Sequence, residues 1–161
     1  MSIRPLGPGE EAPMDLLLLA DPSSEIVQGY LGRGKVYVCA EADAILGVYV
    51  LLSTRPETIE LVNVAVAPER QGQGLGKRMV LHAIETAKRT GCSTIEVGTG
   101  NSGVGQLAFY QKCGFRITGV DLDFFVRHYP GPIVENGIVC RDMIRLRLDC
   151  DDGAGRSSPQ R

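Results

Sequence analysis

Three glycines, Gly72, Gly74 and Gly76, alternate with other residues in a short turn that could bind a phosphate group. An apolar run at 64–67 comes before the turn, and an amphipathic helical pattern begins at about residue 74. Glycine lacks a Cβ atom, so a ligand can approach the backbone closely there. The start of a helix offers unpaired N–H groups and the positive end of the helix dipole. Together these features predict an anion-binding turn, with phosphate as its usual ligand.

The spacing of the glycines excludes two common nucleotide-binding motifs. A P-loop has the pattern G-x-x-x-x-G-K-[ST]. Counting back from Gly76 and Lys77 puts Gln71 at the first glycine, and Arg78 follows the lysine, so the pattern fails twice. The dinucleotide fingerprint is G-x-G-x-x-G, whereas this turn reads G-x-G-x-G. The phosphate therefore belongs to another class of molecule.

The pattern Q-x-x-G-x-G, formed by Gln71, Gly74 and Gly76, resembles the pyrophosphate-binding motif of the GNAT superfamily of N-acetyltransferases. A second segment downstream strengthens the resemblance. It contains Asn101, which is similar to the family's asparagine after a central strand, and a helical pattern with Tyr110 followed by Gly-Phe at 114–115. The resemblance covers about residues 37–125. It implies that Tyr110 meets the sulfur of CoA.

The resemblance implies that acetyl-CoA binds as a cosubstrate, with its pantetheine arm between two parallel strands and along exposed backbone near Val64 and Val66. Sheet topology indicates the same place, because ligands of open α/β sheets bind beyond the carboxyl ends of parallel strands. Many relatives have arginine at the position of Gln71, so Arg70 or Lys77 is expected to compensate for the missing charge. The predicted cofactor-binding residues are Val64, Ala65, Val66, Gln71, Gly72, Gln73, Gly74, Leu75, Gly76, Lys77, Asn101 and Tyr110.

Acetyl transfer to an amine uses a base, an oxyanion donor and a weak acid for the departing thiolate. Glu60 is the candidate base, because an acid that shares a strand face with Val62, Val64 and Val66 is expected to have a raised pKa. By resemblance, histone-modifying members of the family carry a glutamate at the matching position. A backbone N–H near Val66 is the candidate oxyanion donor. Tyr110, a phenol with an ordinary pKa of about 10, is the candidate acid.

Each of these residues also has a structural interpretation. Tyr110 could be a half-buried packing residue, and Glu60 could be a charge at a fraying strand start. Asn101 could cap the following helix instead of orienting pantetheine or a water. The connection at 127–132, which includes Tyr129, is a candidate substrate wall, as is the segment 121–125 before it.

The residue pattern predicts one α/β (α+β) domain over 1–150 and a disordered tail over 151–161. The resemblance implies a GNAT-type mixed, mostly antiparallel twisted sheet with a central parallel pair and about four helices. Asp21 is expected to cap the second helix, with Pro22 in its first position. Strands are expected at 2–6, 35–42, 44–53, 58–67, 93–97, 115–126 and 138–148, and helices at 13–20, 22–32, 74–90 and 103–113.

Composition excludes several function classes. Apolar residues make up 43% of the 161 residues, which argues against global disorder. A net charge of −2 gives no field for nucleic acid or an anionic membrane, and the leucine run at 16–19 is too short to span a bilayer. Five scattered cysteines without a C-x-x-C pair predict reduced thiols in the cytoplasm, with no disulfide framework and no metal site.

These patterns predict a cytoplasmic N-acetyltransferase that acts by direct transfer in a ternary complex. The expected acceptor is a primary amine of a small molecule or peptide, and neither nucleic acid nor membrane is an expected partner. The resemblance also implies a homodimer as one assembly, since relatives often dimerise. The main alternative is a non-catalytic acyl-CoA-binding sensor or interaction module that uses the same turn.

Overall fold

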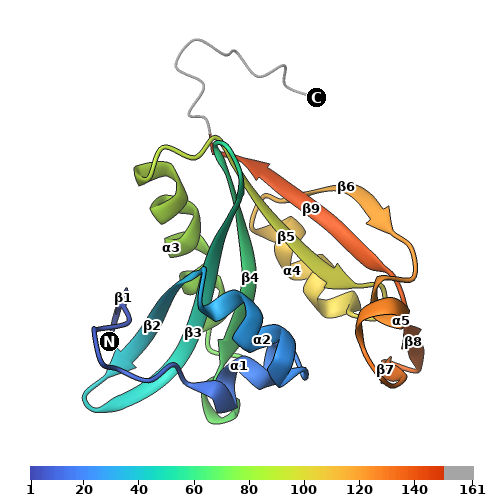
Figure 1. Cartoon of the computed structure of the whole chain (residues 1–161). Coiled ribbons are helices and arrows are strands. Elements are labelled where there is room, and N and C mark those ends of the chain that lie inside the picture. The colour runs from blue at the N-terminus through green and yellow to red at the C-terminus, as the bar shows by residue number, and fades with distance from the viewer. Residues whose placement is uncertain (151–161) are drawn as a thin grey trace.

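The computed structural model describes residues 1–150 and shows a central sheet with helices on both faces (Figure 1). The expected tail at 151–161 lies outside the described residues. The helices are α1 (Met14–Ala20), α2 (Ser24–Leu31), α3 (Leu75–Arg89), α4 (Val104–Lys112) and α5 (Phe124–His128), with a 3-10 turn η1 (Pro68–Arg70). The strands are β1 (Ser2–Pro5), β2 (Lys35–Glu41), β3 (Ala44–Arg55), β4 (Thr58–Val66), β5 (Thr94–Gly100), β6 (Arg116–Asp121), β7 (Ile133–Glu135), β8 (Ile138–Cys140) and β9 (Met143–Asp149).

Seven strands form one sheet in the order β1-β2-β3-β4-β5-β9-β6, and β7 pairs with β8 in a separate hairpin. β4 and β5 are parallel, and the other neighbouring pairs are antiparallel. α3 connects the two parallel strands, which gives the expected βαβ unit. The predicted mixed sheet with a central parallel pair is therefore confirmed. Its five helices include the four that were expected and the short α5.

The core has one apolar cluster on each face of the sheet. Side chains of β3 alternate between the clusters: Tyr49 and Leu51 pack with α3, whereas Val48 and Val50 pack with α1 and α2. Such alternation is the normal pattern of a strand that is covered on both faces. α3 contributes most of its apolar side to the first cluster, including Met79. The sheet is thereby held between two helical layers (Figure 1).

β4 and β5 pair only at their beginnings and then diverge. The last pair in the parallel ladder is Leu61 with Val97, although β4 continues to Val66 and stays paired with β3 throughout. A register shift in the β3–β4 ladder, where Asn63 pairs with Val50 and Leu61 with the next residue, places a β-bulge in β4. Figure 1 shows the two strands separating like a V. Past the bulge, the backbone of β4 has an unpaired edge toward β5.

The bulge also changes which face each β4 side chain occupies. Leu61, before the bulge, packs in the cluster that contains α3 (the α3 cluster). Ala65 would lie on the same face in a regular strand, but after the bulge it packs in the cluster that contains α1 and α2 (the α1–α2 cluster). Val64 and Val66 accordingly pack against the α3 cluster. Glu60 pairs with Leu52, which packs on the α1–α2 side. The expectation that Glu60 shares a face with Val62 is confirmed, since Val62 also packs on the α1–α2 side. The same expectation for Val64 and Val66 is wrong, because one extra residue shifts the alternation.

The start of α2 differs from the expected capping pattern. Ser23 is the N-cap, and its Oγ accepts a 3.2 Å hydrogen bond from the Ile26 N–H. Asp21 lies two residues earlier, and its Oδ1 accepts a 3.1 Å hydrogen bond from the Ser23 N–H. The helix thus begins two residues later than predicted, because the serine hydroxyl reaches an orphan N–H of the first turn. Asp21 is left in the turn between α1 and α2.

The C-terminal part contains two elements that the sequence analysis did not separate. The expected strand 115–126 ends at Asp121, because Asp123 has a left-handed φ of 61° and begins the turn into α5. The expected strand 138–148 is divided into β8 and β9. Only β9 pairs with β6, so the predicted antiparallel pair is correct for that portion alone. β7 and β8 are joined by Asn136 and Gly137, which both have positive φ.

Candidate active site

The glycine turn connects the open end of β4 to the first turn of α3. Gly72 and Gly74 have φ values of 77° and 81°, and Gly74 is the N-cap of α3 without any side-chain cap. An ideal Cβ at either glycine would meet nothing within 4 Å, so the positive φ, not crowding, requires glycine here. The first N–H groups of α3 therefore lack a capping side chain and are available to an anion.

The charges around the turn distinguish the two basic residues that were expected to compensate for Gln71. Arg70 Nη2 lies 3.2 Å from Glu41 Oε2, so Arg70 is already paired. Lys77 is exposed in the first turn of α3, and within residues 1–150 it forms no ion pair. Gln71 itself donates a 3.0 Å hydrogen bond from Nε2 to the Val66 carbonyl. The geometry thus favours Lys77 over Arg70 as the cation nearest a bound pyrophosphate.

One large cavity, of about 1070 Å³, begins at the glycine turn and follows the divergence of β4 and β5. It is lined by 61–66 of β4, 71–72 of the turn, 97–100 of β5, residues of α4 that include Phe109 and Tyr110, 19–22 between α1 and α2, Phe125, Tyr129, Ile133, Glu135, Cys140 and Met143. The predicted residues Val64, Ala65, Val66, Gln71, Gly72 and Tyr110 are therefore brought together. Gln73, Gly74, Leu75, Gly76 and Lys77 continue along the chain from the rim, outside the lining.

Tyr110 is a buried side chain that lines the cavity from α4. It is 9% exposed, and its ring packs against Phe109 and Phe115 at centroid distances of 5.2 and 5.8 Å. Burial, with a smaller contribution from Cys113, raises the pKa of Tyr110 to about 12. The hydroxyl is consequently protonated at neutral pH. It can donate a hydrogen bond to a group in the cavity but is a weaker acid than a thiol.

Glu60 lies one residue before the point where β4 and β5 separate. Burial raises its pKa, Arg145 and Arg55 oppose the rise, and Glu96 adds to it. Its neighbours Leu61 and Val62 line the cavity, whereas Glu60 does not. The expected rise in the pKa of Glu60 is thus confirmed. Because Glu60 lies outside the lining, a group in the cavity does not contact its carboxylate directly.

Asn101 holds the segment between β8 and β9 through both ends of its amide. Its Oδ1 accepts hydrogen bonds from the backbone N–H groups of Arg141 and Asp142, at 2.8 and 3.0 Å. Its Nδ2 donates a 3.1 Å hydrogen bond to the Val139 carbonyl. Asn101 follows Gly100 of the cavity lining but is not part of the lining. It therefore positions the hairpin wall, a role that the sequence analysis did not consider.

Several residues at the far end of the cavity come from the segments that were expected to form a substrate wall. Phe125 and Tyr129 line it, whereas Asp121, Asp123, Phe124 and His128 do not. Asp21 and Glu135 also line it, and neither was identified from the sequence as a site residue. The dipeptide Asn-Gly at 136–137, between two short β-branched runs, is a hairpin signal that could have located Glu135.

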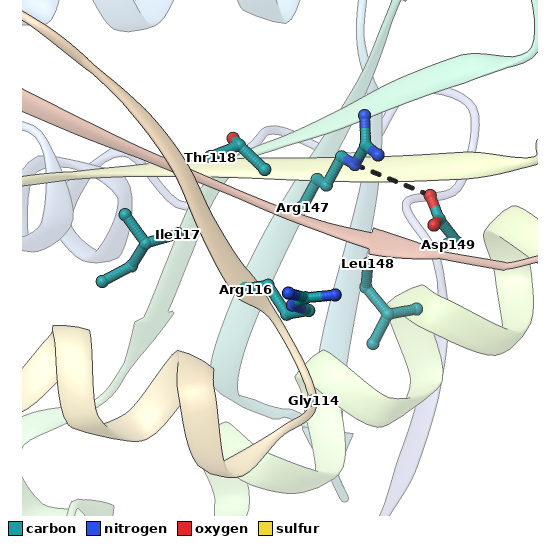
Figure 2. Close-up of a pocket in the computed structure, with 7 residues that line it drawn as sticks. All are labelled: Gly114, Arg116, Ile117, Thr118, Arg147, Leu148 and Asp149. Carbon is teal, nitrogen blue, oxygen red and sulfur yellow. Dashed lines mark ion pairs between the residues drawn. The ribbon is translucent and has the colours of Figure 1, made fainter. Parts of the chain in front are cut away.

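A second, smaller cavity of about 230 Å³ lies between β6 and the end of β9 (Figure 2). Arg116 and Arg147 occupy paired positions there, and Arg147 Nε lies 3.7 Å from Asp149 Oδ1. This cavity shares no residue with the large one and contains none of the predicted site residues. Within residues 1–150 there is no group of three or more His, Cys, Asp and Glu side chains arranged to hold a metal. Nor does that part of the chain contain a helix that is long and apolar enough to cross a membrane.

Comparison with known proteins relates this geometry to acetyl transfer. Residues 10–115 match the model of the acetyltransferase (GNAT) family. The chain is 61% identical to an uncharacterized N-acetyltransferase of Bacillus subtilis, YvbK, over 84% of this chain and 87% of the relative. A GNAT family acetyltransferase from Elizabethkingia anophelis with acetyl-CoA bound superposes with a TM-score of 0.90, at 46% identity, over 92% of this chain and 97% of that one. A Bacillus subtilis acetyltransferase in complex with CoA gives 0.85 at 57% identity, over 92% and 99%.

Proposed function

Because the chain belongs to the acetyltransferase (GNAT) family, we propose that it moves an acetyl group from acetyl-CoA to a primary amine of a small molecule or peptide, by direct transfer in a ternary complex. The continuity of the large cavity carries this proposal. Its lining includes Gly72 of the glycine turn, Tyr110 of α4, and Tyr129 and Glu135 from the segment after α5. Cofactor and acceptor can therefore be bound at once and meet in the middle.

In the proposed complex, the pyrophosphate lies against the N–H groups at 72–76, with Lys77 nearby, and the pantetheine arm follows the unpaired edge of β4. The divergence after Leu61 supports this placement, because it leaves backbone groups of 62–66 without a β5 partner. The relatives solved with acetyl-CoA or CoA bound support the same cosubstrate. A backbone N–H near Val66 is the proposed donor to the oxyanion that forms during transfer.

We propose that Tyr110 stabilises the departing CoA thiolate. Its pKa of about 12 exceeds the value of about 8.5 for an ordinary thiol, so complete proton transfer to the sulfur is unfavourable. A hydrogen bond from the neutral phenol to the thiolate is favourable, and the buried setting strengthens it. Tyr110 thus acts by donating a hydrogen bond, and the thiolate takes its proton from solvent.

Glu60 is the proposed general base. Its raised pKa makes it a stronger base than an ordinary carboxylate. Because it lies just outside the cavity lining, the proton of the attacking amine is proposed to reach it through water. The five cysteines are all free thiols, which supports a cytoplasmic location for the enzyme.

The experiment that tests this proposal combines binding and turnover. Acetyl-CoA at millimolar concentration is expected to raise the melting temperature of the protein, and ATP or NAD is not. A set of primary amines is then screened for thiol release, and the acetylated products are verified by mass spectrometry. Stabilisation by acetyl-CoA without transfer to any amine would instead identify an acyl-CoA sensor. Absence of stabilisation would contradict both the enzyme and the sensor.

A further inference from the structure

The charged residues that line the large cavity are all acidic. The inference drawn from them rests on the proposed function, which makes this part of the cavity the acceptor end. Asp21 and Glu135 are the only charged residues in the lining, which contains no lysine, arginine or histidine within the described residues. They come from separate elements, the turn between α1 and α2 and strand β7. A ligand at this end therefore meets two carboxylates and no cation.

Asp21 is fixed in place by a bond across the cavity wall. The hydroxyl of Tyr129, 108 residues later in the sequence, donates a 2.9 Å hydrogen bond to Asp21 Oδ1. The same oxygen accepts the N–H of Ser23 at 3.1 Å. Burial and the adjacent Asp21 carboxylate raise the pKa of Tyr129, so its hydroxyl keeps the proton that it donates. This bond ties the α1–α2 turn to the segment after α5.

Glu135 is also presented by an anchored element. The hairpin turn beside it is held by Asn136, whose Nδ2 donates a 2.9 Å hydrogen bond to the Ser102 carbonyl. Asn101 holds the other end of the hairpin through Val139. The Glu135 carboxylate itself forms no hydrogen bond or ion pair within residues 1–150. Its charge is therefore available to a ligand.

Asn63 is a buried polar residue of the cavity lining that has one unsatisfied atom. It lines the cavity, is 3% exposed, and donates through Nδ2 to the Leu17 carbonyl and the Tyr30 hydroxyl. Its Oδ1 is buried and has no hydrogen-bond partner among the described residues. An unsatisfied buried carbonyl is unfavourable, because it has lost its hydrogen bonds to water without gaining another partner. The wall of the cavity thus contains an unsatisfied acceptor in addition to the two carboxylates.

We propose that the acceptor is a diamine or polyamine, in which one amino group is acetylated while a second, cationic one is held by Asp21 and Glu135. A carboxylate that touched the reacting amine would stabilise its ammonium form and oppose attack. The two carboxylates are more useful to a second amino group, away from the thioester. Phe125 and Tyr129, with ring centroids 5.3 Å apart, supply aromatic surface for the aliphatic chain and for the cation.

Three acceptors of equal length test this inference: a straight-chain diamine (cadaverine), the matching amino alcohol and the matching amino acid. The diamine is expected to have the highest kcat/KM and the amino acid the lowest. Glu135→Gln and Asp21→Asn are each expected to raise KM for the diamine by about threefold to fivefold, with kcat little changed, as for one ion pair near the surface. The matched control is Glu11→Gln, an exposed carboxylate outside the cavity, which should change nothing.

The outcomes separate the inference from the function on which it rests. Equal or better use of the amino alcohol, or transfer only to amines without a second cationic group, overturns the inference and leaves acetyl transfer intact. Absence of thiol release with every primary amine overturns the proposed function. Calorimetry of cadaverine with the CoA complex gives a measure independent of turnover. Binding is expected to weaken in Glu135→Gln, and absence of binding in the unsubstituted protein contradicts the inference.

Discussion

Glu60 on β4 and Glu96 on β5 occupy paired positions in the parallel ladder, one step before the two strands separate. Glu96 is held by Arg55, whose Nη2 lies 3.0 Å from Glu96 Oε1. The pKa of Glu60 is raised first by burial and then by Glu96, against the opposing effect of Arg145. A carboxylate whose pKa is raised, one residue before the lining of the large cavity begins, is suited to the proposed role of taking a proton from an amine.

Replacement of the proposed base should slow transfer. Glu60→Gln is expected to lower kcat by about a hundredfold, the usual range for loss of a general base. In the unsubstituted enzyme, kcat/KM should fall as the pH drops through the folded pKa of Glu60, which lies above 4.5. Glu96→Gln is the matched control: activity should persist, and the acid limb should move to lower pH because a neighbouring negative charge is gone. An unchanged pH profile in Glu60→Gln would contradict the role.

Glu60→Gln should raise the stability of the folded protein even though it lowers activity. A carboxyl with a raised folded pKa binds its proton more tightly in the native state, so its contribution is greatest below the unfolded pKa and is lost as pH rises through the folded value. Glu60→Gln imitates the protonated form and should raise the melting temperature at neutral pH. The difference should vanish below about pH 4.5, the ordinary value for this group. Thermal unfolding across this pH range measures it, and a lower melting temperature in the variant at neutral pH would be inconsistent with the burial.

Tyr110→Phe removes the proposed hydrogen bond to the thiolate and leaves the ring in place. We expect kcat to fall by about 100-fold, the lower end of the range for loss of one oxyanion-hole donor. The dissociation constant of acetyl-CoA should change by less than about twofold, because the hydrogen bond forms as the thiolate leaves. Single-turnover kinetics and calorimetry provide the two values. Unimpaired turnover in the variant would assign Tyr110 to packing alone.

The left-handed backbone of the glycine turn gives a test of cofactor binding. Gly74→Ala places a side chain at φ 81°, which costs about 1 kcal/mol and shifts the N–H groups that begin α3. Acetyl-CoA binding should weaken by about tenfold, or about 1.4 kcal/mol. The control is Gly29→Ala, the same change inside α2 where a Cβ meets nothing within 4 Å, and it should slightly stabilise the protein. Equal acetyl-CoA affinity in both variants would place the pyrophosphate elsewhere.

Asn101→Ala separates a role in the acceptor wall from direct cofactor binding. Three hydrogen bonds to 139–142 are lost, which should lower stability by about 1–3 kcal/mol and loosen the hairpin. KM for the acceptor should rise more than the dissociation constant of acetyl-CoA. Loss of acetyl-CoA affinity with an unchanged acceptor KM would favour the pantetheine role that the family resemblance implies.

The glycine turn and the elements around it could be predicted because their signals are local in sequence. Gly72 and Gly74 mark a turn whose backbone needs positive φ, and the strand before and helix after follow from apolar periodicity. Tyr110 was found by its distance from the following Gly-Phe. The direction of the Glu60 pKa shift was predicted correctly, although Val64 and Val66, on which the prediction partly rested, lie on the other face of the sheet. Each of these depends on residues close together in the chain.

The proposed acceptor half of the cavity could not be predicted because it depends on long-range contacts. A bulge in β4 reverses the alternation of side chains after Leu61, and alternation alone gives no sign of it. Asp21 meets Tyr129 across 108 residues, and Asn101 meets 139–142 across about 40. Glu135 reaches the cavity only because the β7–β8 hairpin is held against the turn before α4. Tertiary packing, not local propensity, brings these side chains together.

Direct acetyl transfer is tested most directly by initial rates with acetyl-CoA and an accepted amine varied together, while the acetylated amine is quantified by mass spectrometry. A ternary complex predicts double-reciprocal lines that intersect, one acetylated amine for each CoA released, and protein that carries no acetyl group. Parallel lines together with an acetylated protein, for example at Cys140 in the cavity lining, would contradict the account.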